Sequence, residues 1–315
     1  MLDVPKEVSV AVSISNPPRI FESVTELVGR TPMVQIHSHN VPGVEIFAKL
    51  ESFNPGGSVK DRPALRMIQE GLKNGKLTKD KAILDATSGN TGIAYAMIGA
   101  ALGYRVVLAL PANVSDERKR ILKSFNAEVH FSSEMEGSDG AILLARELYK
   151  KDPEKYFVPD QYNNPENPKA HTLTTAEEIM ELLGDRITHF AAGIGTSGTL
   201  IGTGKRLKEM KPSIKVVAME PSQPFHGLEG LKHMASSIVP GIYDKNSYDQ
   251  HIDIDTDESY EWVKVLARKE GILAGLSSGG AMAGCVQLAK EIKKGCIVTI
   301  FPDSGDKYLS TRVWE

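Results

Sequence analysis

Apolar residues along the chain gather in short runs that alternate with longer segments of helical periodicity. The runs rich in Val, Ile and Leu predict strands, several of them covered on both faces, at residues 45–50, 82–86, 105–110, 127–131, 188–192, 215–219 and 295–301. The segments between them predict helices at residues 59–74, 91–102, 115–125, 138–150, 170–183, 199–209, 258–270 and 279–293. This alternation indicates parallel sheets with right-handed crossovers, in which ligands bind on the loops that lead from a strand into a helix.

The chain of 315 residues is long enough for two lobes, each with its own core. Residues 157–168 are rich in proline and asparagine, and we expect them to join the lobes or to cross the cleft between them. Residues 1–20 lack the pattern of a signal peptide and predict a flexible arm. Because no window has the length of a membrane span, we expect no membrane association.

Charge and cysteine content exclude several further classes. The 37 Lys and Arg residues against 40 Asp and Glu residues give a formal charge of −3, which leaves no basic surplus for nucleic acid. Cys285 and Cys296 cannot build a disulfide framework, and neither they nor His37 and His39 have the spacing of metal ligands. We therefore expect a cytoplasmic protein that binds neither nucleic acid nor a metal ion.

A tight Gly56-Gly57 turn leads into the predicted helix that begins near residue 59. Ser58 is the expected N-cap, with Asp61 three positions later as in a capping box. This places Lys60 in the first turn, where a cation opposes the helix dipole. An exposed lysine is the ordinary interpretation, but a lysine beside a glycine turn at a cleft can lose its proton and act as a nucleophile or base.

A second loop, with the sequence ATSGNTG at residues 86–92, follows a strand and opens a helix. Its backbone N–H groups, hydroxyls and one amide suit a carboxylate or a phosphate. Helix capping by Ser88 or Asn90 explains the same residues equally well. This loop alone does not decide between the two.

The third loop, GIGTSGT at residues 193–199, also lies between a strand and a helix. It matches G-x-G-x-x-G, and Glu220 ends the next strand where a dinucleotide-binding fold keeps its ribose-binding acid. A pocket for a single phosphate explains the loop equally well. A fourth segment, GLSSGG at residues 275–280, opens the last long helix, and there a serine cap is the simpler interpretation.

Taken in order, the motifs SVKDR, TSGNTGIA, GIGTSGT and LSSGGA resemble those of the pyridoxal-phosphate enzymes of the cysteine synthase and cystathionine β-synthase family. The resemblance runs from about residue 21 to residue 313, includes QYNNPENPKAH and DKYLST, and is closest to the B-type cysteine synthases. It implies fold type II, an α/β architecture of two lobes. Each lobe is a mostly parallel twisted sheet flanked by helices, with the cofactor in the cleft between them.

The resemblance also implies a division of the chain and a homodimer. Residues 21–50 and 161–315 would form the larger domain, which binds the cofactor phosphate. Residues 51–160 would form a smaller mobile domain that carries the loop for the substrate carboxylate.

By the same resemblance, Lys60 forms the Schiff base with pyridoxal 5'-phosphate and acts as the catalytic base. Asn90 contacts the ring hydroxyl of the cofactor, and Ser277 faces its pyridine nitrogen. The residues of the third loop hold the cofactor phosphate: Gly195, Thr196, Ser197, Gly198 and Thr199. The residues that bind the substrate carboxylate are Thr87, Ser88, Gly89, Asn90 and Thr91, helped by Gln161.

The reaction implied is β-replacement of the acetate of O-acetyl-L-serine, or the phosphate of O-phospho-L-serine, by sulfide or a thiol donor. It gives L-cysteine through an aminoacrylate intermediate. Condensation of serine with homocysteine, as in cystathionine β-synthase, is an alternative within the superfamily. Two further alternatives are an NAD-dependent oxidoreductase, which would use the third loop and Glu220, and a non-catalytic binding module with an inert Lys60.

The chain departs from the family pattern at four places. Ser197 replaces a more usual glycine, and the sequence TTAEE at residues 174–178 replaces Thr-Thr-Gly-Pro-Glu. Pro302 stands where thiosulfate-using relatives carry a cysteine. Relatives that prefer phosphoserine resemble this chain around Lys232 but carry an arginine near that position. Lysine keeps the positive charge and loses the bidentate recognition of phosphate. O-acetylserine is therefore the first expected donor, with Lys232 a substrate-binding residue.

Overall fold

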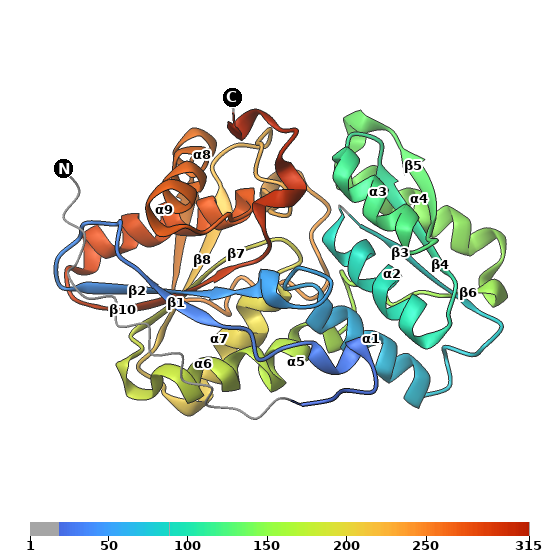
Figure 1. Ribbon diagram of the computed structural model, residues 1–315, viewed down its shortest axis with the longest axis horizontal. Coiled ribbons are helices and arrows are strands. Elements are labelled where there is room, and N and C mark those ends of the chain that lie inside the picture. The colour runs from blue at the N-terminus through green and yellow to red at the C-terminus, as the bar shows by residue number, and fades with distance from the viewer. Residues whose placement is uncertain (1–18, 88, 315) are drawn as a thin grey trace.

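The computed structural model describes residues 19–87 and 89–314, so residues 1–18 of the predicted arm lie outside the described part. It contains two sheets side by side, each flanked by helices (Figure 1). The larger sheet has the order β1 (Met33–Ile36), β2 (Val44–Leu50), β10 (Gly295–Phe301), β7 (His189–Gly193), β8 (Lys215–Pro221), β9 (Gln250–Ile254). The smaller sheet has the order β5 (Glu128–Ser132), β4 (Val106–Pro111), β3 (Ala82–Ala86), β6 (Tyr156–Phe157).

All neighbouring strands pair in parallel except β1, which runs antiparallel to β2 at the edge of the larger sheet. The predicted α/β class with two mostly parallel sheets is thus confirmed. The smaller sheet is accompanied by α1 (Asp61–Lys73), α2 (Asn90–Leu102), α3 (Asp116–Ser124) and α4 (Gly137–Lys151). The larger sheet lies between α8 (Thr256–Val265) and α9 (Leu276–Ile292) on one face and α5 (Glu166–Leu173), α6 (Thr175–Leu183) and α7 (Gly198–Met210) on the other.

Strand β8 shows why the strands of the larger sheet read as continuously apolar. Val217 and Met219 point into the core shared with α9, whereas Val216 and Ala218 point into the core shared with α6 and α7. Both faces of the strand are therefore buried, as expected for a parallel strand covered on two sides.

The predicted strands are all present, with ends shifted by one or two residues. The prediction missed β1, β6 and β9, because each is either an edge strand or only two residues long, and β9 alternates polar with buried residues. The predicted helix over residues 170–183 is instead two helices, broken at Thr174, whose backbone is not helical. The predicted helix over 258–270 ends as α8 at Val265 and continues as one wider turn, Leu266–Glu270.

In the TTAEE segment at residues 174–178, Ala176 packs in the core and Glu177 pairs with Arg206. Glu178 accepts from Arg62 Nη1 at 2.6 Å and pairs with Lys49 Nζ at 2.7 Å.

Each sheet reverses its strand order at one point. In the smaller sheet the chain proceeds from β3 outward to β5 and then returns through α4 to β6, on the other side of β3. In the larger sheet β7 is followed outward by β8 and β9, while β10 returns to the other side of β7. Ligands of open α/β sheets bind at such switch points, which here are the loops after β3, β7 and β10.

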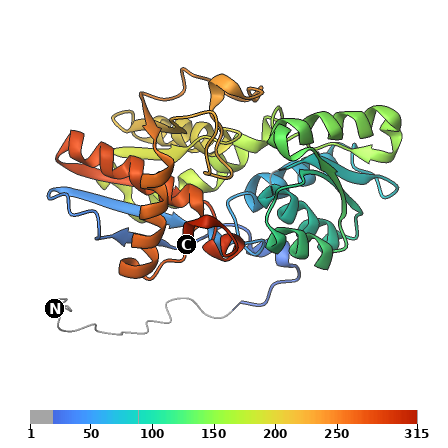
Figure 2. The same cartoon turned by 90° about the horizontal axis from the view of Figure 1, so that it is seen from above.

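The C-terminal segment returns to the middle of the molecule, beside the junction of the two halves (Figure 2). There Ser115 Oγ donates to Lys307 O at 2.9 Å, and Ser310 Oγ donates to Glu117 at 3.0 Å. The end of the chain therefore ties the helix after β4 to the half that contains β10. Within the described residues, the longest and most apolar helices fall short of what a bilayer crossing requires.

Candidate active site

The loops at the two switch points and the start of α1 border one cleft of about 700 Å³, part of it open to solvent. The cleft brings together Lys60, Asn90, Thr91, residues 195–199 and Ser277. A smaller adjoining space of about 390 Å³ shares Lys60 and Thr91 and adds Gln161 and Lys232. Residues predicted from four separate motifs are therefore neighbours in space.

Lys60 lies immediately before α1, not in its first turn as predicted. The predicted capping box is also wrong: Ser58 Oγ accepts from Lys60 N at 3.2 Å, and Asp61 accepts from Gly56 N at 2.5 Å. The glycine turn brings Gly56 N, and not Ser58 N, to the Asp61 carboxylate. Burial lowers the pKa of Lys60, and the nearby Asp303 carboxylate partly opposes that shift.

Asp303 follows β10 directly and organises this side of the cleft. Its Oδ2 accepts from Asn90 Nδ2 and from the Tyr308 hydroxyl, each at 2.7 Å. Asn90 Oδ1 accepts from Lys307 Nζ at 3.1 Å, so both ends of the amide are held. We did not predict Asp303 from the sequence, although it lies two residues after a buried strand, at the end where ligands of such sheets bind.

The loop after β3 is held from within. Thr87 Oγ1 accepts from Gly89 N at 3.0 Å and from Gly92 N at 3.1 Å, so Thr87 shapes the loop. Among the described residues of this loop, Asn90 and Thr91 line the cleft and Thr87 does not. Gly89 has φ of +139°, and a Cβ there would lie 2.5 Å from Arg118 Cδ, so only glycine fits. Ser88 lies outside the described residues.

Asn90 is the first residue of α2 and not its cap, and the hydroxyl of Thr87 accepts from Gly92 N in the first turn. The predicted cap at Ser88 lies outside the described residues. Gln161 joins the loop to the long irregular segment before α5. Its Oε1 accepts from Thr91 Oγ1 at 2.9 Å, and its Nε2 donates to Ala86 O at 2.5 Å. The predicted crossing segment thus places Gln161 against the loop after β3.

The loop after β7 ends at the N-terminus of α7 and has the features of an anion cradle. Ser197 has φ of +74°, which explains why a glycine is more usual there, and its buried Oγ has no partner among the described residues. A Cβ at Gly195 would lie 2.3 Å from Gly230 O, so the two backbones meet with no room for a side chain. Asn167 Nδ2 supports the loop by donating to Thr196 Oγ1 at 3.1 Å.

Ser277 lies in the first turn of α9, buried against the cleft. The helix begins after Gly275 without a side-chain cap, so the serine-cap interpretation of this segment is wrong. The hydroxyl of Ser277 therefore lies beside the cleft and does not cap the helix.

Glu220 does not face the cleft as an NAD ribose acid would. Its Oε1 accepts from Met234 N at 2.8 Å, and its Oε2 lies 3.4 Å from His251 Nε2. The carboxylate instead fixes the segment after β8, so the G-x-G-x-x-G match lacks its acidic partner.

The donor set of the cleft fits pyridoxal phosphate. A helix N-terminus, a backbone cradle closed to side chains and the orphaned Ser197 hydroxyl suit the phosphate. Asn90 and Ser277 would offer polar groups to the ring, and the half-buried Lys60 would offer an amine. These residues would hold the cofactor between the two sheets.

Comparison with known proteins gives the same result. Residues 24–303 match the family model described as pyridoxal-phosphate dependent enzyme. A cysteine synthase of Aquifex aeolicus is 54% identical over 302 residues, covering 93% of this chain and 92% of that protein. A crystal structure of a cysteine synthase from Entamoeba histolytica is 38% identical with a TM-score of 0.89 and covers 96% of this chain and 94% of that one.

A crystal structure described as an O-acetylserine dependent cystathionine beta-synthase from Helicobacter pylori is 34% identical, with a TM-score of 0.89, and covers 95% of this chain and 100% of that one. The predicted family, cofactor and fold type are thus confirmed. The chain belongs to the pyridoxal-phosphate-dependent enzymes of fold type II, in the cysteine synthase family of B type.

Proposed function

We propose that the protein makes L-cysteine by replacing the β-substituent of an activated serine with sulfide, and that O-acetyl-L-serine is its preferred donor. The observation that carries the proposal is the half-buried Lys60, which lines one cleft together with the loop after β3 and the loop after β7. O-phospho-L-serine is the second expected donor.

Bound pyridoxal phosphate supplies an electron sink for negative charge at the substrate α-carbon. Lys60 provides the base: burial lowers the pKa of its amine, which makes the neutral form more accessible. The same amine takes the α-proton and later returns it. Asp303 keeps this shift moderate, because its negative charge favours the protonated amine.

Residues 195–199 and the N-terminus of α7 would hold the cofactor phosphate, and Asn90 would contact the ring hydroxyl. Ser277 would face the ring nitrogen. A serine hydroxyl, unlike a carboxylate, does not favour a protonated ring nitrogen, so it limits the lifetime of a carbanion at the substrate. This favours elimination and replacement over transamination.

The substrate carboxylate would bind to the loop of residues 87–91, where Thr91 faces the cleft and Gln161 holds the Thr91 hydroxyl. We propose that residues 51–160 form the smaller domain and close over the substrate. The larger domain would consist of residues 21–50 and 161–315. Closure excludes water from the reacting carbon.

Lys232 would meet the leaving group of the donor. Its ammonium lies 3.0 Å from Asp139 Oδ1, so its charge is already paired, and the site suits an uncharged acetyl ester better than a phosphate. A second candidate is condensation with homocysteine, favoured by the likeness to the Helicobacter pylori structure, whose description names O-acetylserine as the donor.

Steady-state assays of the holoenzyme distinguish these reactions. We expect O-acetylserine with sulfide to give the highest kcat/KM, ahead of O-phosphoserine with sulfide and of serine or O-acetylserine with homocysteine. Lys60→Ala is the matched control and should abolish turnover while the fold is kept. Equal activity of Lys60→Ala and wild type would contradict the proposal, and faster use of homocysteine would replace it by the second candidate.

We also propose that the protein is a cytoplasmic homodimer. Its support is a group of exposed apolar side chains beside a groove at the N-terminal end of the described chain. Phe53 is 65% exposed, and the exposed Phe21 and Leu27 line the same groove. Phe53→Asp should shift the protein toward the monomer in sedimentation velocity, and an unchanged dimer would place the interface elsewhere.

A further inference from the structure

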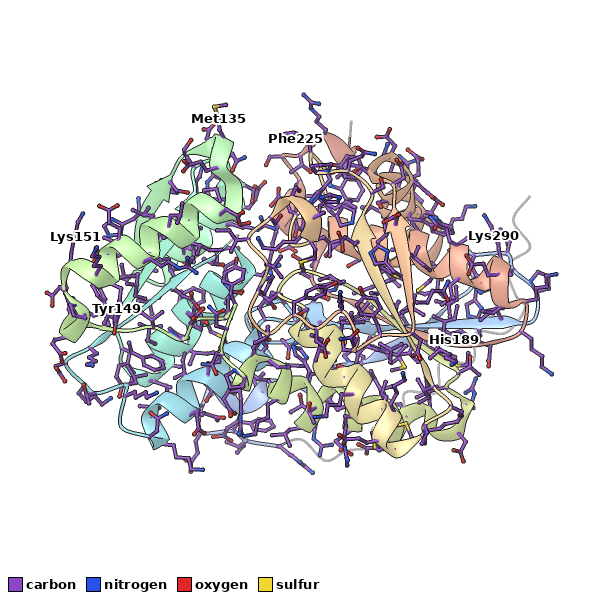
Figure 3. All side chains as sticks on the ribbon, turned by 180° about the vertical axis from the view of Figure 1, so that it is seen from behind. Met135, Tyr149, Lys151, His189, Phe225 and Lys290 are labelled. Carbon is purple, nitrogen blue, oxygen red and sulfur yellow. The ribbon has the colours of Figure 1, made fainter. Side chains whose placement is uncertain are left out.

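The first turn of α4 reaches across to the segment that follows β8. Asp139 Oδ1 lies 3.0 Å from Lys232 Nζ, and Asp139 Oδ2 accepts from Ile238 N at 2.8 Å. Ser138 Oγ accepts from the same ammonium at 3.2 Å. Figure 3 shows Met135, just before α4, and Phe225, just after β8, at the tips of the two halves.

Lys232 is therefore a buried cation whose partners come from the other half of the molecule. Its side chain is 7% exposed, whereas that of Asp139 is 30% exposed. Two of the three ammonium N–H bonds are directed to Asp139 and Ser138. The ammonium also lies 5.6 Å from the centroid of the Tyr162 ring.

Lys232 also borders the space that adjoins the main cleft, opposite Lys60 and beside Thr91 and Gln161. In the proposed binding mode, with the substrate carboxylate on the loop after β3 and the α-carbon at Lys60, the β-substituent would enter this space. An acetyl ester carries no charge, whereas a phosphate monoester carries almost two negative charges at neutral pH. The charge that distinguishes the two donors would therefore lie beside the pair of Lys232 and Asp139.

The sign of the local field depends on Asp139. Lys232 alone would attract a phosphate strongly, because a buried unpaired cation gains more from an anion than an exposed one does. With Asp139 in contact, the pair is neutral overall, and the phosphate would also be repelled by the carboxylate. An uncharged acetyl group is little affected by this cancellation.

We propose that Asp139 determines donor specificity: by pairing with Lys232 across the cleft, it disfavours a dianionic leaving group and selects an uncharged ester. The inference rests on the proposed function for the identity of the two donors. Asp139 acts through Lys232 and does not touch the reacting atoms, so it is a positioning residue.

The test is the specificity ratio, kcat/KM for O-phosphoserine divided by kcat/KM for O-acetylserine, in the holoenzyme of Asp139→Asn. The amide still accepts from Ile238 N but removes the negative charge. We expect the ratio to rise about tenfold or more, through a lower KM for O-phosphoserine, and the gain to shrink at high salt. Glu147→Gln, which makes the same change on the exposed face of α4, should leave the ratio unchanged.

Whether Asp139 acts through Lys232 is tested by introducing Asp139→Asn into the Lys232→Gln variant. If Asp139 acts mainly through Lys232, Asp139→Asn should change the ratio much less in that background. The inference is overturned if Asp139→Asn leaves the ratio unchanged, lowers both donors equally, or raises the ratio equally without Lys232.

The first half-reaction separates failure of this inference from failure of the proposed function. The concentrations of O-phosphoserine and O-acetylserine that give half of the change in the visible absorbance of the cofactor are measured without sulfide. A ratio of these half-saturation concentrations that shifts toward O-phosphoserine in Asp139→Asn supports the inference even if another acceptor replaces sulfide. An unshifted ratio overturns it in either case.

Discussion

Adding one methyl group at Gly195 tests how the loop after β7 holds the cofactor. An alanine Cβ would lie 2.3 Å from Gly230 O, whereas ordinary contacts of this kind begin near 3.4 Å. Both atoms involved are tied to backbone, so the two segments must separate by about 1 Å. The separation widens the cradle exactly where we place the phosphate, without removing any polar group.

The size of the effect follows from the cost of such overpacking, which is about 1–3 kcal/mol. Since a factor of ten corresponds to about 1.4 kcal/mol, Gly195→Ala should weaken pyridoxal-phosphate binding by about 5- to 150-fold. The assay is titration of the apoprotein with pyridoxal phosphate, followed by visible absorbance. Thermal unfolding of the apoprotein shows separately how much the fold itself has lost.

Gly280→Ala is the matched control. Gly280 lies inside α9, and its nearest neighbour would be 3.5 Å from the new Cβ, which is ordinary contact. Alanine there should leave cofactor affinity unchanged and stabilise the helix by up to about 1 kcal/mol. Wild-type affinity in Gly195→Ala would refute the assignment of the loop to the phosphate.

Three further changes probe the surroundings of the site. Arg62→Met leaves the fully buried Glu51 carboxylate without the guanidinium that lies 2.7 Å away, and should cost about 3–5 kcal/mol in urea unfolding; a loss below 1 kcal/mol would contradict this. Asp303→Asn removes the charge that raises the pKa of Lys60, so the acidic limb of the pH–kcat profile should move to lower pH, and a move to higher pH would contradict the assignment. Burial raises the pKa of Asp85 to about 7, so the free energy of unfolding is highest below about pH 4 and falls by up to about 4 kcal/mol between pH 4 and pH 7. Asp85→Asn should flatten this pH dependence of the unfolding free energy, and an unchanged slope would contradict the shift.

The sequence predicts well those features that depend on neighbours along the chain. Buried strands such as β8 and the glycine-rich loops after β3 and β7 are local patterns, so their place at the carboxyl ends of strands follows from the α/β class. The resemblance to cysteine synthases added the cofactor, which the family match confirms. The roles of single residues such as Lys60 remain predictions.

Features that depend on distant contacts could not be predicted. Asp139 and Lys232 are far apart in the chain and meet only because α4 packs beside the segment after β8. The capping box at Ser58 and Asp61 has the right spacing, yet the glycine turn brings Gly56 to the carboxylate instead. In both cases the three-dimensional packing selects one contact from several that the sequence permits equally.

The most direct test of the account is the visible absorption spectrum of the purified holoenzyme while O-acetylserine and then sulfide are added. We predict a cofactor band that shifts on addition of O-acetylserine and returns when sulfide is added, with L-cysteine formed in equal amount. Lys60→Ala should bind pyridoxal phosphate without this cycle. A wild-type band that ignores O-acetylserine, or that shifts and never responds to sulfide, would contradict the proposed reaction.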